Sequence, residues 1–61
     1  MNVFEQIRSD LNELVKLVRE SERYCASVAA KPELASEESH AKEIRRERRI
    51  IELSVRYGVT A

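Results

Sequence analysis

Apolar side chains in the first half of the chain recur in alternating steps of three and four residues. On a helix with about 3.6 residues per turn, these steps keep one stripe of side chains on the same side over many turns. Such a stripe is typical of coiled coils and helical bundles, where it packs against a neighbouring helix. The stripe predicts a long first helix whose core-facing residues are Phe4, Ile7, Leu11, Leu14, Val18, Cys25 and Val28, with Ser21 completing the series.

Capping and helix-breaking residues set the bounds of this helix and of a second one. Asn2 is a suitable N-cap, and Pro32 disfavours helix in the residue before it, so helix 1 is expected at about 2–30 and a turn at about 30–36. Helix 2 begins at Pro32 or at Ser36, since both residues suit a helix start, and is placed at about 33–57. Gly58 suits the left-handed position that closes a helix, which leaves 58–61 as a tail of a single domain, 1–61.

The second helix carries two apolar stripes instead of one. A rotation of about 100° per residue separates them by more than a quarter of the helix circumference, so one neighbouring helix cannot cover both. We expect one stripe to pack within the chain and the other to pack against a second copy. The stripe expected within the chain is Ile44, Ile51 and Val55, and the stripe expected between copies is Ile50, Leu53 and Tyr57.

A chain of 61 residues buries too little surface for two helices to be stable alone, and one cysteine excludes a disulfide within the chain. Of the other usual sources of stability, a metal ion and self-association, self-association is the one expected here. The predicted fold is therefore all-α, an antiparallel two-helix hairpin that dimerises into a four-helix bundle. A reversal at about residue 31 would place Leu11 beside Ile51, Ile7 beside Val55, and Leu14 beside Arg48.

The formal charge is zero, but residues 1–41 carry a net −3 and residues 42–61 a net +3. Several cations of the second helix fall within a sector of about 100°, which is a pattern found on helices that follow phosphate groups. The same stripe could instead bind an acidic protein, or pair with neighbouring glutamates as a solvated face. These cations are Lys42, Arg45, Arg46, Arg49 and Arg56.

Two helices of similar length joined by a tight turn resemble the Rop family of plasmid copy-number regulators in architecture alone. That resemblance implies a dimeric RNA- or DNA-binding regulator that uses the arginine stripe of helix 2. We keep this regulator as the alternative to the leading functional prediction.

The leading prediction is a small regulatory or adaptor protein that binds an unidentified protein through a helical face and can inhibit it. An assembly subunit, which predicts oligomers larger than a dimer, is a further alternative. Arginine and large apolar or aromatic side chains dominate many interfaces. The anchors expected for the partner are Arg48, Ile50, Leu53 and Tyr57.

The sequence contains no complete set of residues for a catalytic or metal site. Cys25 is expected in the apolar core, and Glu37 with His40 supplies only half of a di-metal bundle site, since Glu13 and Glu20 are expected on the outer face of helix 1. No catalytic residue, metal or cofactor is predicted. With no apolar run long enough to cross a membrane, a cytoplasmic location is expected.

Overall fold

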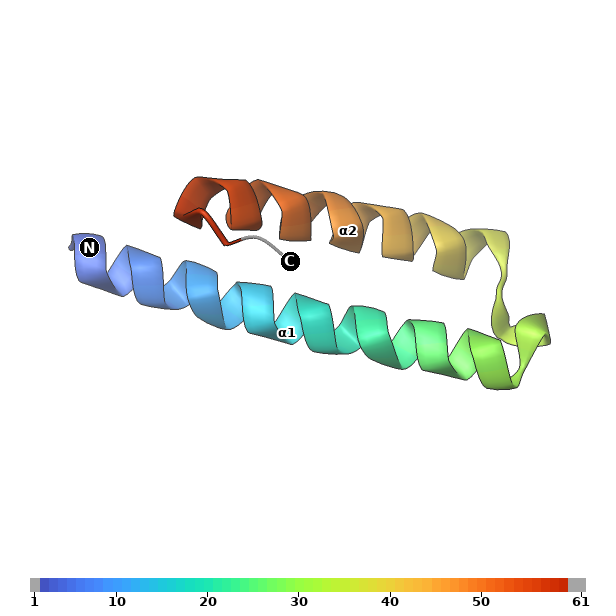
Figure 1. The fold of residues 1–61 in the computed structure, drawn as a ribbon. Coiled ribbons are helices and arrows are strands. Elements are labelled where there is room, and N and C mark those ends of the chain that lie inside the picture. Colours follow the sequence, from blue (N-terminus) through green and yellow to red (C-terminus); the bar gives the residue numbers. More distant parts are fainter. Residues whose placement is uncertain (1, 60–61) are drawn as a thin grey trace.

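A computed structural model describes residues 2–59, and it is an antiparallel hairpin of two long helices (Figure 1). Helix α1 spans Val3–Ala30, a short 3-10 helix η1 spans Pro32–Leu34, and helix α2 spans Glu37–Tyr57. The principal extents are 44 × 20 × 15 Å. The prediction of an all-α helical hairpin is confirmed.

Helix α1 begins where the sequence predicts a cap. The Asn2 side-chain oxygen accepts a hydrogen bond from the Glu5 backbone N–H at 2.8 Å, which satisfies one of the free N–H groups of the first turn. At the other end, the Lys31 N–H donates to the Ser27 carbonyl at 2.8 Å, and Pro32 follows. Helix α1 therefore ends directly before the proline that disfavours its continuation.

Each of the two expected starts of helix 2 has a counterpart in the turn. Pro32 begins η1, and Ser36 caps α2 by accepting from the Ser39 N–H at 3.0 Å. The Ser39 hydroxyl in turn accepts from the Ser36 N–H at 2.9 Å, which completes a reciprocal capping box. The chain thus makes one 3-10 turn before the second α-helix starts.

Helix α2 ends at Tyr57 because Gly58 takes a left-handed conformation with φ of +67°. The N–H groups of Gly58 and Val59 donate to the carbonyls of Val55 and Ser54 at 3.3 and 2.8 Å, which satisfies two carbonyls of the last turn. Of the tail expected at 58–61, Thr60 and Ala61 lie outside the described residues.

The two helices meet along a seam that contains two buried leucines and several polar contacts. Leu53 is 0% exposed and Leu14 is 8% exposed. Between them and the turn, Ser21 donates to Glu43 at 2.6 Å, and the hydroxyls of Tyr24 and Ser39 lie 3.2 Å apart. The residues that face each other again follow steps of three and four, but on a stripe rotated from the predicted one.

The predicted pairing of apolar stripes within the chain is wrong. Leu11 is 37% exposed, Ile51 61% and Val55 75%, whereas Leu53 lies in the seam. In the predicted orientation Arg48 would have faced Leu14 with no partner for its charge, and burying an unpaired charge costs several kcal/mol. The observed rotation leaves Arg48 exposed, and the stripe expected between copies packs inside the hairpin instead.

Candidate functional site

The end of the seam farthest from the turn is built around a buried carboxylate. Asp10 is 4% exposed and accepts hydrogen bonds from the Tyr57 hydroxyl, from Arg56 Nη1 at 2.9 Å and from Gln6 Nε2 at 3.0 Å. The Tyr57 bond, together with those from Arg56 and Gln6, lowers the pKa of Asp10 below its usual 3.8 despite burial. The same bond raises the pKa of Tyr57.

A second buried carboxylate lies nearer the turn. Glu43 is 5% exposed, accepts from the Ser21 hydroxyl and forms an ion pair with Arg46. Burial raises the pKa of Glu43, but the hydrogen bonds from Ser21 and Arg46 outweigh it, so this pKa lies below its usual 4.5. Among residues 2–59, no buried side-chain oxygen or nitrogen lacks a hydrogen-bond partner, and both carboxylates therefore belong to a structural network in the seam.

A third acid of α1 reaches across to α2. Glu13 was expected on the outer face, but it accepts two bonds from Arg49, from Nε at 2.8 Å and from Nη2 at 3.0 Å. Arg49 also pairs with Glu52 at 2.9 Å. The bond from Arg49 lowers the pKa of Glu13, and the bonds to Glu13 and Glu52 raise that of Arg49. The paired fork geometry makes this the best-defined ion pair between the helices.

The cations predicted to form a nucleic-acid stripe on helix 2 are mostly engaged inside the hairpin. Arg46, Arg49 and Arg56 pair with Glu43, Glu13 and Asp10, and Lys42 lies 3.6 Å from Glu38. Of the five, only Arg45 has no carboxylate within 4 Å among residues 2–59. The pattern that suggested a phosphate-binding stripe is therefore largely a set of ion pairs that joins and flanks the two helices.

The predicted protein-binding anchors are divided by the fold. Leu53 is completely buried and Tyr57 is held by Asp10, so neither presents its side chain as a free anchor, because both belong to the seam. Ile50 is half-buried, and Arg48 is exposed. The surface expected from Leu53 and Tyr57 is thus already occupied by the chain itself.

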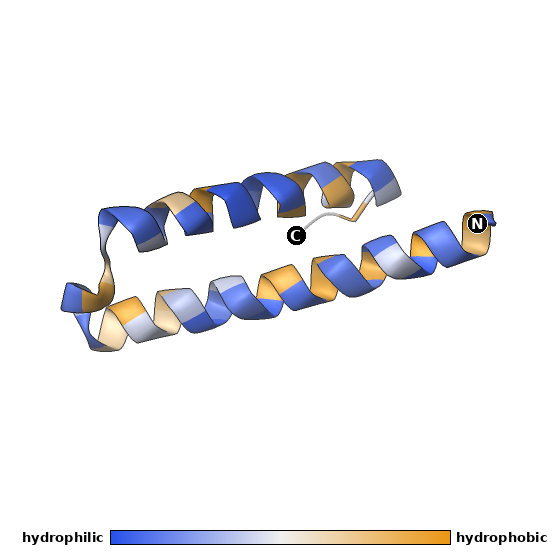
Figure 2. Cartoon of the chain, turned by 180° about the vertical axis from the view of Figure 1, so that it is seen from behind, coloured by the Kyte–Doolittle hydropathy of each residue, from blue (hydrophilic) through white to orange (hydrophobic). Residues whose placement is uncertain are grey.

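The other apolar stripe is left on the surface. Phe4 is 79% exposed, Val18 36%, and Ile51 61%. A shallow hollow between the helices is lined by Val18, Ser21 and Glu22 from α1 and by Glu47, Ile50 and Ile51 from α2. Val18 and Ile51 therefore lie on the same side of the hairpin. Figure 2 shows apolar segments recurring along both helices between strongly polar ones. Helical periodicity continues the stripe along each helix from Val18 and from Ile51. We call the two stripes together the apolar side; its members are Phe4, Leu11, Val18, Cys25, Ile44, Ile51 and Val55.

Several members of the predicted first-helix core therefore do not face α2. Phe4, Leu11, Val18 and Cys25 are exposed, while Ile7 and Val28 are half-buried and Leu14 is buried. The reason is that the seam runs along the edge of the predicted stripe that contains Leu14, and Asp10 and Ser21 complete it. Within one hairpin, the rest of the stripe has no apolar cover.

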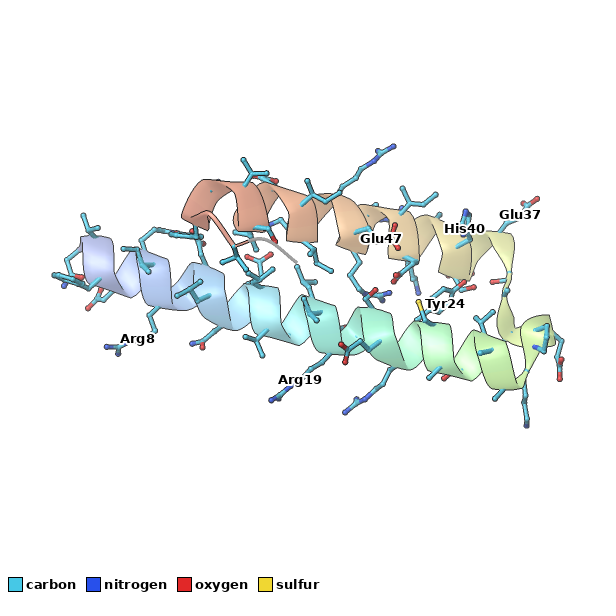
Figure 3. All side chains as sticks on the ribbon, viewed as in Figure 1. Arg8, Arg19, Tyr24, Glu37, His40 and Glu47 are labelled. Carbon is cyan, nitrogen blue, oxygen red and sulfur yellow. The ribbon has the colours of Figure 1, made fainter. Side chains whose placement is uncertain are left out.

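Helix α1 also carries cations that sequence reasoning did not single out. Arg8, Lys16, Arg19 and Arg23 are exposed, and none has a carboxylate within 4 Å in the described part of the chain. Figure 3 shows Arg8 and Arg19 projecting away from α2. Counting charge over residues 1–41 hid them, because the acids of that segment include Asp10 and Glu13, which turn inward. Their spacing on one helix face was the signal that could have found them.

Residues considered for chemistry lie apart on the surface. His40 and Glu37 are exposed beside the turn (Figure 3), and no group of three or more possible metal ligands occurs among residues 2–59. No helix in that range is both long and apolar enough to cross a bilayer.

Comparisons with protein-family models, with curated proteins and with solved structures find no match to this chain.

Proposed function

We propose that this chain is a small, non-enzymatic, cytoplasmic regulatory or adaptor protein that works by helix packing between chains, as a homodimer whose two hairpins form a four-helix bundle. The observation that supports this most directly is the uncovered apolar side, where Phe4 and Val55 are 79% and 75% exposed. Several large apolar side chains left exposed along a folded chain favour an interaction site there.

The surface area of the hairpin supports a second chain on that side. Its accessible surface is 5026 Å² for a mass of 7.1 kDa. A compact monomer of that mass is expected to expose about 4,100 Å². The excess of roughly 900 Å² is close to the approximately 800 Å² that each partner buries in a standard stable interface.

A dimer formed through the apolar side leaves the outward side of α1 free for another protein. Lys16, Arg19 and Arg23 lie within about 60° of helix rotation and span about 10 Å along the axis. A row of exposed cations that have no carboxylate within 4 Å among residues 2–59 fits the acidic surface of another protein, and arginine is frequent among the anchors of such interfaces. We assign the partner-binding role to this outward row in place of Leu53 and Tyr57.

The test is a capture experiment with a charge-reversed variant. Tagged wild type, a Lys16→Glu/Arg19→Glu/Arg23→Glu variant and an Arg45→Gln/Arg48→Gln control are exposed to lysate that has or has not been treated with nuclease. We expect a protein partner that survives nuclease, remains with the control, and is lost with the charge-reversed variant. Equal helix content by circular dichroism shows that the variants are folded.

Two results would overturn the proposal. Bound material that disappears with nuclease would instead support the alternative function, an RNA- or DNA-binding regulator. A partner that stays bound to the charge-reversed variant would show that the outward row is not the binding surface.

A further inference from the structure

Helix α1 extends beyond the end of α2, and this overhang carries the most exposed large apolar residue among residues 2–59. Tyr57, the last residue of α2, bonds to Asp10, so the first turns of α1 project past α2 (Figure 1). Phe4 lies in this overhang and is 79% exposed. Residues 2–59 of one hairpin leave Phe4 uncovered, and a second chain can cover it.

The α1 stripe is symmetric about a point, two of the three α2 residues are symmetric about another, with Arg48 as the counterpart of the third, Ile51, and the two points are level. Phe4, Leu11, Val18 and Cys25 repeat every seven residues about a midpoint between residues 14 and 15. On α2, Ile44 and Val55 lie equally far from a midpoint between residues 49 and 50. Ser21 and Glu43 are hydrogen-bonded, and each lies the same number of residues from the midpoint of its own helix, on the side of the turn. The two midpoints are therefore level with each other. One two-fold axis can therefore pass through both midpoints, as a self-complementary interface requires.

A second set of residues lies beside the α1 stripe, on the edge away from α2, and it can also pair with itself across a two-fold axis. Arg8, Val15 and Glu22 also repeat every seven residues, with Val15 in the centre. In an antiparallel contact between two copies of α1, Arg8 faces Glu22 and Val15 faces Val15. Neither Arg8 nor Glu22 has an ion-pair partner in the described part of the hairpin.

We propose that the apolar side is occupied by a second copy of this chain whose α1 runs antiparallel to the first α1, with the two turns at opposite ends of the bundle. Phe4 then packs on Cys25 of the second copy, Leu11 packs on Val18, and Arg8 pairs with Glu22. A large ring opposite a small side chain fills the space that two large side chains could not share. This arrangement rests on the dimer of the proposed function and specifies how its two chains meet.

The other two-fold arrangement places both turns at the same end, so that α1 packs on α2 of the second copy. Both overhangs would then project from the same end of the bundle, beyond the last residue of each α2. Phe4 would remain in water in both copies, and Arg8 would not meet Glu22. The overhang and the edge charges therefore favour turns at opposite ends.

Disulfide trapping distinguishes the two arrangements. The variant Phe4→Cys keeps the native Cys25, and the two thiols lie about 30 Å apart within one helix, far beyond the roughly 7 Å limit between Cα atoms of a disulfide. We expect mild oxidation to convert most of this variant into a covalent dimer. Wild type, which has only Cys25, is the control and should stay uncrosslinked, because the two copies of Cys25 also lie about 30 Å apart.

A charge swap tests the same arrangement without altering the apolar side. Arg8→Glu and Glu22→Arg should each weaken dimerisation roughly fivefold, since each puts like charges opposite one another at two symmetric places, and the double variant should restore it. This measurement is decisive if Phe4→Cys, lacking the ring, fails to dimerise.

The outcomes separate the two proposals. A wild-type mass of two chains by light scattering, with no crosslink in Phe4→Cys and no rescue by the double charge swap, would overturn the antiparallel arrangement and leave the dimer standing. A wild-type mass of one chain at all concentrations would overturn the dimer itself.

Discussion

Replacing Leu53 by alanine tests which side of α2 faces α1. Leu53 is the only fully buried side chain among residues 2–59, whereas Val55, two positions later, is 75% exposed. Truncating a buried leucine costs about 2–5 kcal/mol, because the transfer free energy of the lost methyl groups adds to the cost of the cavity. A domain of this length has a total unfolding free energy of about 3–9 kcal/mol, so Leu53→Ala should remove a large share of it.

The measurement is thermal and urea unfolding followed by circular dichroism over a range of protein concentrations. Leu53→Ala should lower the midpoint by at least about 10 °C, given roughly 4–8 °C per kcal/mol for a domain of this size, and should do so at every concentration. Val55→Ala is the matched control. Its effect should be seen chiefly where the dimer forms, since Val55 has little cover within one hairpin.

The register would be refuted if Leu53→Ala cost less than about 1 kcal/mol while Val55→Ala was severely destabilising at low concentration. That pattern would place Val55 inside the hairpin and Leu53 outside, as the sequence first suggests.

Acidification should destabilise the hairpin: the pKa values of Asp10 and Glu43 are lowered below 3.8 and 4.5, so the stability they contribute is full above about pH 5 and is lost as pH falls through those lowered values. Urea midpoints measured from pH 7 to pH 2 check this, and a flat profile contradicts it. Tyr57 has a raised pKa, so its contribution should be lost only above pH 10, which absorbance titration of the folded chain can follow. Gly58→Ala should cost about 1–2 kcal/mol in thermal melts, because alanine is strained at φ of +67° although nothing lies within 4 Å of the added methyl group; an unchanged midpoint would argue against the left-handed cap. Ser36→Ala should cost about 1 kcal/mol through loss of the capping box, and Ser36→Asp, which keeps a cap acceptor, should recover most of it.

The helices and their ends could be predicted because the signals are local. Asn2 and Ser36 cap the helix starts, and Gly58 provides the left-handed residue after α2. Each of these residues acts on backbone groups within one turn of its own position. These capping signals can therefore be interpreted without knowing where the neighbouring helix lies.

The rotation of the helices about their axes could not be predicted in the same way. The seam on α1 is rotated by only about 50° around the helix axis from the most apolar stripe, and apolar spacing alone favours the latter. What decides between them is the placement of polar groups. Asp10 and Glu43 lie in the seam because Tyr57, Arg56, Ser21 and Arg46 can satisfy them there, and that set of partners spans both helices.

The candidate binding surfaces changed for the same reason. Arginines of helix 2 that looked available for phosphate meet acids that the sequence places many residues away, as Arg49 meets Glu13. The cations of α1 can be recognised as unpaired in the described part of the chain only when the structure shows that the neighbouring acids turn inward. Charge totals over a segment cannot distinguish an inward acid from an outward one.

The measurement that tests the central claim most directly is the mass of the wild-type chain by sedimentation equilibrium across a range of micromolar concentrations. The uncovered apolar side predicts a reversible dimer of twice 7.1 kDa, and Phe4→Glu, which puts charge on that side, should shift it toward monomer. A wild-type chain that stays at 7.1 kDa throughout would contradict the claim that a second copy covers this surface.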